Sequence, residues 1–302
     1  MNKIYVSDKS PVDTKMPLVI LVDRGSASAS EIVTGAIQDL DRGVVIGQRS
    51  YGKGLVQQTV QLVYNTQMKV TIAKYYTPSG RCIQALDYFH KNPDGSVDKI
   101  ADSLMSEFKT KNGRLVYDGS GIYPDVLLDA KKYSNISSAL MSKTIIFNYS
   151  TKYRFSHPVI SLAKDFSLTD AEYDDFIKYV LEKEFDYTTK SEKALDDFKE
   201  IAEKEQYFEN VKAEYDALKK KTVHNKQEDL MKFKNEIEQL LEQEIASRYY
   251  YQNGRLETSF DTDAEVLKAI SVLRNTSLYL SIVKGEGDYK VIGKPKKDIK
   301  KN

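Results

Sequence analysis

The chain is poor in the residues that build disulfides and metal sites. Its 302 residues include one cysteine, three histidines, seven prolines and no tryptophan. The single Cys82 excludes an internal disulfide and a zinc site built on several cysteines. No apolar run approaches the roughly 20 residues of a membrane-spanning helix. Residues 1–15 lack the apolar stretch of a signal peptide, so none is expected in this chain.

An excess of charge of one sign is also missing. Lysine and arginine number 45 against 44 aspartates and glutamates, which gives a formal net charge of +1. A general nucleic-acid binder is therefore not expected, because such proteins carry a basic excess. Hydrophobic residues make up 41% and charged residues 29%, which is the balance of a soluble globular protein.

Glycine and charge divide the chain into two parts. Residues 1–130 hold 11 of the 15 glycines and 29 charged side chains, whereas residues 131–302 hold 60 charged side chains. Turn-forming residues favour a strand-rich or mixed domain, and dense balanced charge favours solvated helices. We therefore expect a first domain over residues 1–130 and a helical accessory domain over residues 131–302.

The first part predicts an α/β fold. Residues 17–22 (PLVILV) form a short apolar run that is typical of a strand buried on both faces. Residues 28–40 carry apolar side chains at helical spacing, and Gly43 opens a second apolar run, VVIG. This order predicts a βαβ unit. Residues 55–62 and 68–76 alternate or are β-branched and predict two further strands.

The second part predicts helices. Thr-x-x-Glu capping boxes at Thr169, Thr189 and Thr262 indicate three helix starts. The apolar stripe of the longest charged stretch is expected to face the chain's own core. That stripe includes Leu218, Met231, Ile237 and Leu241.

Small residues follow the first predicted strand and lead directly into the predicted helix (RGSASASEIVTGAIQDL, residues 24–40). They allow a sharp turn, and a serine at such a turn lies where helix amides stabilise negative charge. The arrangement follows the logic of a nucleophile elbow, although the G-x-S-x-G spacing is absent. Taken alone, Ser26, Ser28 and Ser30 are also explained as helix caps and small packing residues.

A serine nucleophile needs a base. His90, His157 and His224 belong to no recognisable motif, so a Ser-His-Asp triad has no support in the sequence. The alternative base is a lysine that has lost its proton through desolvation. Lys53 in the segment YGKG is the candidate, because its glycine neighbours leave room around the amine; an exposed turn lysine is the other interpretation.

Residues 47–53 also read G-x-x-x-x-G-K, the pattern of a phosphate-binding loop. Gly54 stands where that loop needs a serine or threonine to bind Mg²⁺. A strand pattern follows, whereas the phosphate-binding loop opens a helix. Nucleotide binding is therefore not expected.

Four blocks together resemble the C-terminal processing peptidases, or tail-specific proteases, of the S41 serine peptidase family. They are GSASASE (residues 25–31), YGKG with VQQ (51–54 and 56–58), YTPSGRCIQ (76–84) and GIYPD (121–125). The resemblance covers residues 15–128 and implies part of a ClpP/crotonase-like core. The helical remainder matches only loosely.

The resemblance implies a serine endopeptidase that cleaves polypeptides near their C-termini without a cofactor or metal. It assigns the nucleophile to Ser28, the general base to Lys53, and the residue that orients the lysine to Gln57. Lys53 and Gln57 are four residues apart, which in a strand places them on one face. The N–H of Ala29 would supply one oxyanion-hole donor. The polypeptide substrate is expected to bind as an added strand.

Members of this family carry a PDZ domain upstream, and a glycine-rich segment with a second oxyanion donor. Neither is found in these residues, so we expect a partial peptidase domain whose isolated activity is reduced or lost. The family implies a periplasmic or cell-envelope location, and an oligomer or an adaptor is compatible with it. Non-catalytic relatives that bind retinoids share the architecture, so a ligand- or protein-binding module on the same fold is the alternative.

Overall fold

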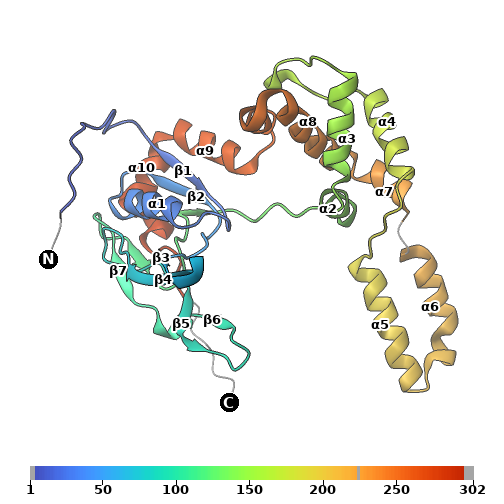
Figure 1. The fold of residues 1–302 in the computed structure, drawn as a ribbon, viewed down its shortest axis with the longest axis horizontal. Helices are drawn as coiled ribbons and strands as arrows, with labels where there is room; N and C mark the ends of the chain where they lie inside the picture. Colours follow the sequence, from blue (N-terminus) through green and yellow to red (C-terminus); the bar gives the residue numbers. More distant parts are fainter. Residues whose placement is uncertain (1–3, 223–224, 296–302) are drawn as a thin grey trace. The chain divides into compact units, whose positions relative to one another are not determined.

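The computed structural model describes residues 4–222 and 225–295 and divides the chain into two compact units (Figure 1). Unit 1 contains residues 1–130 together with the residues from Ala264 onward, and unit 2 is Lys131–Asp263. The helical domain was expected to continue to residue 302. The chain instead returns to unit 1 at Ala264, because the helices that follow carry apolar faces that pack against the sheet of unit 1.

Unit 1 mixes strands and helices, as the sequence predicted. Its main elements are β1 (Val19–Val22), α1 (Ala29–Asp39), β2 (Val44–Gly47), β3 (Leu55–Gln61), β4 (Gln67–Lys74), β5 (Leu86–Lys91), β6 (Val97–Lys99), β7 (Glu107–Lys109), β8 (Leu115–Tyr117), β9 (Val126–Leu127), α9 (Ala264–Arg274) and α10 (Thr276–Lys284).

A three-stranded parallel sheet in the order β1-β2-β9 lies at the centre of unit 1. The segment β1-α1-β2 is the predicted βαβ unit. All four residues of β2 are buried, but β1 is only partly so, with Leu21 41% exposed. The prediction of a fully buried first strand is therefore wrong, because β1 pairs only with β2 among the described residues.

Helices α9 and α10 cover one face of this sheet. Val44 and Ile46 of β2 point to the same face by strand alternation. They pack against a buried apolar cluster from the two helices: Ala269, Val272, Tyr279 and Ile282. The Tyr279 hydroxyl also accepts the backbone N–H of Leu18 at 3.1 Å. The last part of the described chain therefore completes the core of unit 1.

Helix α1 has an unusual polarity. Its buried side chains include Glu31, Gln38 and Asp39, while Ile32 and Val33 on its apolar stripe are 47% and 58% exposed. A buried polar side chain is costly unless it is hydrogen-bonded. The polar face of α1 is therefore the one that organises the surrounding loops.

Three antiparallel hairpins extend from the sheet: β3–β4, β5–β6 and β7–β8 (Figure 1). The first hairpin confirms the two strands expected after Lys53. Its register shifts between Val56 and Gln57, which pair with Ala73 and Thr71, so the extra residue at this bulge is Ile72 of β4.

Unit 2 is helical. Its helices are α2 (Asn135–Ser142), α3 (Ile145–Ser156), α4 (Asp170–Leu181), α5 (Lys190–Lys204), α6 (Phe208–Thr222), α7 (Lys226–Lys232) and α8 (Lys234–Glu257). Thr169 and Thr189 are the N-caps of α4 and α5, and each forms the predicted capping box. Among the described residues, no single helix is long and apolar enough to cross a membrane. Only α9 and the segment Thr276–Lys290, taken together as a bent pair, reach the length and apolar composition of a membrane span.

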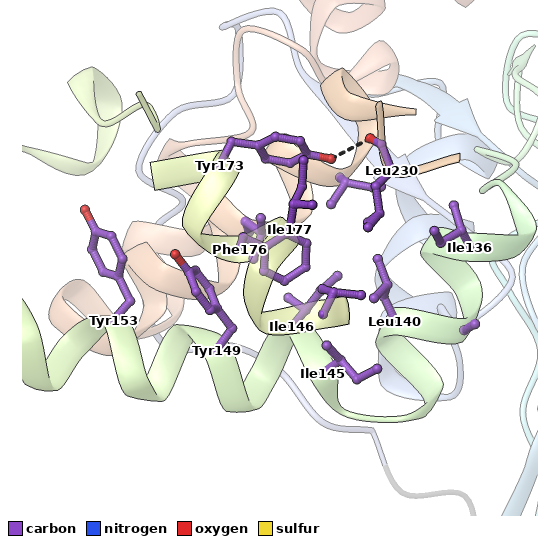
Figure 2. Close-up of a cluster of buried hydrophobic side chains, with 14 of the residues drawn as sticks. Ile136, Leu140, Ile145, Ile146, Tyr149, Tyr153, Tyr173, Phe176, Ile177 and Leu230 are labelled. Carbon is purple, nitrogen blue, oxygen red and sulfur yellow. Dashed lines mark hydrogen bonds between the residues drawn. The ribbon is translucent and has the colours of Figure 1, made fainter. Parts of the chain in front are cut away.

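The core of unit 2 is built by α2, α3, α4, α7 and α8 (Figure 2). Phe176 and Tyr149 pack edge to face with ring centroids 4.9 Å apart, and the Tyr173 hydroxyl donates to the carbonyl of Leu230 at 2.7 Å. The prediction for the longest charged stretch was half right. Ile237 and Leu241 are buried in this core, whereas Leu218 and Met231 are 52% and 55% exposed.

Candidate functional site

The turn after β1 is held by one aspartate. The Asp23 carboxylate accepts the backbone N–H groups of Gly25 and Ser26, each at 2.9 Å, and the Ser26 hydroxyl at 3.0 Å. These bonds wind the chain sharply between β1 and α1. The turn therefore delivers Ser28 to the N-terminus of α1, as the sequence predicted.

Ser28 is the N-cap of α1 in a rare conformation, with φ 56° and ψ −115°. A positive φ costs a non-glycine residue of order 1–3 kcal/mol and persists only where the surroundings enforce it. Ser28 and Glu31 form a capping box, in which the Ser28 side chain faces the N–H of Glu31 and the Glu31 side chain accepts the N–H of Ser28. A serine at a strained strand-to-helix turn is also the arrangement that a serine nucleophile requires.

Glu31 enforces this conformation. Its side chain is fully buried and accepts four hydrogen bonds. The donors are the N–H of Ser28 (2.9 Å), the hydroxyl of Ser50 (2.5 Å), the N–H of Gly52 (2.7 Å) and the N–H of Lys53 (2.9 Å). Three of the four donors are backbone N–H groups, which can only donate, so the Glu31 carboxyl oxygens are the acceptors. One side chain therefore joins the backbone of Ser28 to that of Lys53.

Tyr75 makes a second connection between the same two residues. Its hydroxyl donates to the carbonyl of Lys53 and lies 3.4 Å from the carbonyl of Ser28. Burial, followed by the charge of Glu31, raises the pKa of the Tyr75 phenol. The phenol therefore keeps its proton and remains a hydrogen-bond donor at neutral and moderately alkaline pH.

The Lys53 loop passes through a narrow space. Gly52 has a φ of +89°, and a Cβ added there would lie 2.3 Å from the Cβ of Ala85. The sequence suggested that the glycines leave room around the lysine amine. The structure gives a different reason, because Gly52 and Gly54 are buried and pack against Gln84 and Ala85.

The Lys53 side chain is half-buried, and its ammonium forms no ion pair or hydrogen bond with other residues in the described part of the chain. Ala29 is the first residue of α1, and its N–H likewise has no partner within residues 4–222 and 225–295. An uncommitted amine and an uncommitted helix amide are the groups that a base and an oxyanion donor require.

The structure does not bring Gln57 to Lys53. Lys53 lies two residues before β3 begins at Leu55, so the strand alternation on which the same-face prediction relied does not extend to it. The exposed Gln57 amide instead donates to the Thr71 hydroxyl at 3.5 Å. That distance is at the limit of a hydrogen bond, so the contact holds the amide only weakly.

No histidine takes the place of Lys53 in the described hydrogen bonds of the site. His90 is exposed and bonds to Asp87 at 2.7 Å, while His157 stacks on Tyr153 in unit 2. His224, the third histidine, lies outside the described residues. Within the described ranges there is also no cluster of three or more His, Cys, Asp or Glu side chains that could hold a metal ion.

The far end of α1 is fixed by two buried arginines. Arg81 donates to Asp39 and to Gln38, both at 2.7 Å. Arg114 bonds to Asp41 at 2.6 Å and to Asp125 at 2.7 Å. Arg81 and Asp125 belong to the third and fourth sequence blocks, so these two blocks anchor the helix that carries Ser28 at its start.

We expect Gly52→Ala to lower the free energy of unfolding by about 3 kcal/mol. The new side chain would strain the backbone at this positive φ, and its Cβ would overlap the Cβ of Ala85. Urea unfolding followed by circular dichroism measures this loss. Gly113→Ala is the matched control, since Gly113 has a φ of +85° and no neighbour within 4 Å of an added Cβ. Equal losses in the two variants would contradict the packing argument.

We expect Tyr75→Phe to lower the free energy of unfolding by about 1 kcal/mol, because it removes one neutral hydrogen bond to the Lys53 carbonyl. Urea unfolding measures this loss. The neighbouring Tyr76, which is 63% exposed, provides the control variant Tyr76→Phe, which should leave the stability unchanged. Equal stability of Tyr75→Phe and the parent chain would show that this contact does not hold the Lys53 loop.

Comparison with known proteins gives two family matches. Residues 1–97 match the model of "Peptidase family S41", and residues 136–273 match "Probable PDZ-protease, C-terminal helical domain". The first match contains the Ser28 turn and the Lys53 loop, and the second lies almost entirely within unit 2.

Individual relatives agree with the first match. The chain is 43% identical over 98 residues to the chloroplastic C-terminal processing peptidase of Tetradesmus obliquus, covering 32% of this chain and 20% of that protein. It is 51% identical over 70 residues to a carboxy-terminal-processing protease of Bartonella bacilliformis, covering 23% and 16%. It is 32% identical over 142 residues to a "Probable CtpA-like serine protease" of Staphylococcus aureus, covering 47% and 22%.

The matched regions span about a fifth of the length of these relatives. The four sequence blocks, the two family matches and the named relatives lead to the same assignment. Residues 1–97 of this chain are similar to the S41 peptidases, among them carboxyl-terminal-processing proteases, and residues 136–273 are similar to the C-terminal helical domain of probable PDZ-proteases.

Proposed function

We propose that the chain carries the Ser-Lys dyad of a serine endopeptidase that cleaves polypeptides near their C-termini. Ser28 is the nucleophile and Lys53 is the general base. The observation that supports this proposal most is the buried Glu31 carboxylate, which accepts the N–H groups of both residues at 2.9 Å. A dyad needs two segments held in fixed register, and Glu31 holds these two.

The reaction is an acyl transfer. The neutral amine of Lys53 takes the proton of the Ser28 hydroxyl as its oxygen attacks a peptide carbonyl. The N–H of Ala29 stabilises the oxyanion of the tetrahedral intermediate, as an amide at a helix N-terminus can. Lys53 then returns the proton to the leaving amine, and a water molecule activated by the same lysine hydrolyses the acyl-enzyme.

Gln57 is proposed to hold the Lys53 amine during this cycle. The contact of the Gln57 amide with Thr71 is weak, so the amide can leave it and turn toward the lysine, which lies four residues earlier in the chain.

We assign the helical unit 2 the part of an accessory domain. Polypeptides bound as an added strand are the proposed substrates, the cell envelope is the proposed location, and an oligomer or adaptor stays open.

The test is digestion of a peptide with an apolar C-terminus. It uses the 302-residue chain and its Ser28→Ala and Lys53→Ala variants. We expect both variants to lose at least about 10²-fold in kcat/KM, the usual contribution of a nucleophile or base. Ser30→Ala, two residues along the same turn, is the matched control and should retain activity.

Unchanged cleavage in Ser28→Ala would overturn the assignment. Peptide binding without cleavage in every form would favour the alternative, a non-catalytic binding module on the same fold. The simultaneous presence of Ser28, Lys53 and the Glu31 connection speaks against that alternative, because a binding module has no need for a strained serine whose backbone is joined through Glu31 to that of a lysine.

A further inference from the structure

A cavity of about 620 Å³ lies in unit 1 at the carboxyl ends of the parallel strands. Arg24 comes two residues after β1, Gln48 and Arg49 follow β2, and Leu127 ends β9. The carboxyl edge of a parallel sheet is where α/β proteins place their ligands, because the connecting loops diverge there. The position alone makes the cavity a candidate binding site.

The charge of the lining is strongly one-sided. Arg24, Arg49 and Lys99 line the cavity, against the single acidic residue Asp129. None of the three basic side chains forms an ion pair or a side-chain hydrogen bond with another residue of the described chain. Elsewhere in unit 1 the buried arginines are paired with carboxylates. Three unpaired cations around one cavity therefore favour an anionic ligand.

The rest of the lining is largely apolar. Tyr51, Leu86, Tyr123 and Leu127 contribute to it, and Tyr51 and Leu127 remain 55% and 52% exposed. Exposed apolar surface beside cationic groups does not suit a small, fully hydrated anion. It suits an anion that carries apolar groups next to its charge.

The wall of the cavity is continuous with the Ser28 turn. Ser50 lines the cavity, and its hydroxyl donates to Glu31, the residue that also accepts the N–H of Ser28. The N–H of Tyr51, another lining residue, donates to the carbonyl of Ser26 at 3.0 Å. The wall of the cavity is therefore hydrogen-bonded to the turn that carries Ser28.

We propose that this cavity binds a carboxylate of the polypeptide substrate together with the apolar side chains beside it. The carboxylate comes either from the free C-terminus or from an Asp or Glu side chain. Arg24, Arg49 and Lys99 supply the charge, and the leucine and tyrosine side chains receive the apolar flank. The role as a substrate subsite rests on the proposed function, whereas the binding itself does not.

The test measures binding without catalysis. The probe is a fluorescein-labelled peptide of alanine and leucine that contains one Glu and has a free C-terminus, titrated by anisotropy into the 302-residue chain with Ser28→Ala. Two further peptides replace the Glu by Gln or amidate the C-terminus. We expect the peptide that lacks the recognised carboxylate to bind about tenfold more weakly, as for one charged hydrogen bond.

Removal of the cations should abolish that difference. The triple variant Arg24→Gln, Arg49→Gln, Lys99→Gln should bind all three peptides alike, and Lys111→Gln, an exposed lysine that does not line the cavity, should keep the preference. Weakening by the amide assigns the carboxylate to the C-terminus, and weakening by Gln assigns it to a side chain. Equal affinity of the parent chain for all three peptides, or a preference that survives in the triple variant, would overturn the proposal, whether or not the chain cleaves peptides.

Discussion

Glu31→Gln should lower the free energy of unfolding by about 3 kcal/mol and kcat/KM by at least about 10²-fold. Glu31 accepts hydrogen bonds from four donors, two on each carboxylate oxygen. An amide presents an NH₂ group to one of these pairs, so at least one N–H donor is left facing another donor. The register between Ser28 and Lys53 is then lost together with the bonds that set it.

Urea unfolding and peptide hydrolysis measure the two effects of Glu31→Gln. Glu107→Gln is the control, because Glu107 is exposed on β7 and should change neither quantity appreciably. Ser50→Ala removes only one donor and should cost about 1 kcal/mol. If Glu31→Gln were as stable and active as the parent chain, Glu31 would not be the residue that holds the dyad together.

Arg114→Met should lower the free energy of unfolding by about 3–5 kcal/mol. The Arg114 side chain is 1% exposed and bonds to Asp41 and Asp125, whose side chains are also inaccessible. Its removal strands two buried carboxylates, and desolvated charges without partners are among the most destabilising defects in a protein. The C-terminal end of α1 and the loop before β9 would lose their common anchor.

A compensating variant separates this mechanism from simple loss of packing. Adding Asp41→Asn and Asp125→Asn to Arg114→Met removes the unpaired charges and should recover part of the lost stability. Lys111→Met, which removes an exposed cation nearby in sequence, should stay within about 0.5 kcal/mol of the parent chain. A loss below about 1 kcal/mol in Arg114→Met would mean that the network does not anchor α1.

Patterns among residues close together in the sequence predicted much of the fold. The βαβ unit, the β3–β4 hairpin and the capped starts of α4 and α5 each depend on side chains close together in sequence, and all were predicted. The return of α9 and α10 to unit 1 was not. It depends on contacts such as that between Tyr279 and Leu18, which are separated by 261 residues and leave no periodic signal.

The candidate site divides in the same way. The roles of Ser28 and Lys53 stay predictions from their blocks, and Glu31 stood in the first block at the Ser-x-x-Glu spacing of a capping box. The role of Glu31 as acceptor for the Lys53 loop was not predicted. Its donors Ser50, Gly52 and Lys53 reach the carboxylate only after the chain has folded around β2. Tyr75 had no sequence signal of any kind. The role of Gln57 stays a prediction, and the same-face argument for it does not hold because Lys53 lies before the start of β3.

The central claim is that Lys53 activates Ser28, and covalent labelling tests it most directly. A fluorophosphonate reacts with a serine hydroxyl only when a base makes it nucleophilic. The parent chain and its Lys53→Ala and Gln57→Ala variants would be labelled, and the modified residue identified by mass spectrometry. The account predicts an adduct on Ser28 that forms at least about 10²-fold more slowly in Lys53→Ala. Labelling of another residue, or of Ser28 at the same rate without Lys53, would contradict it.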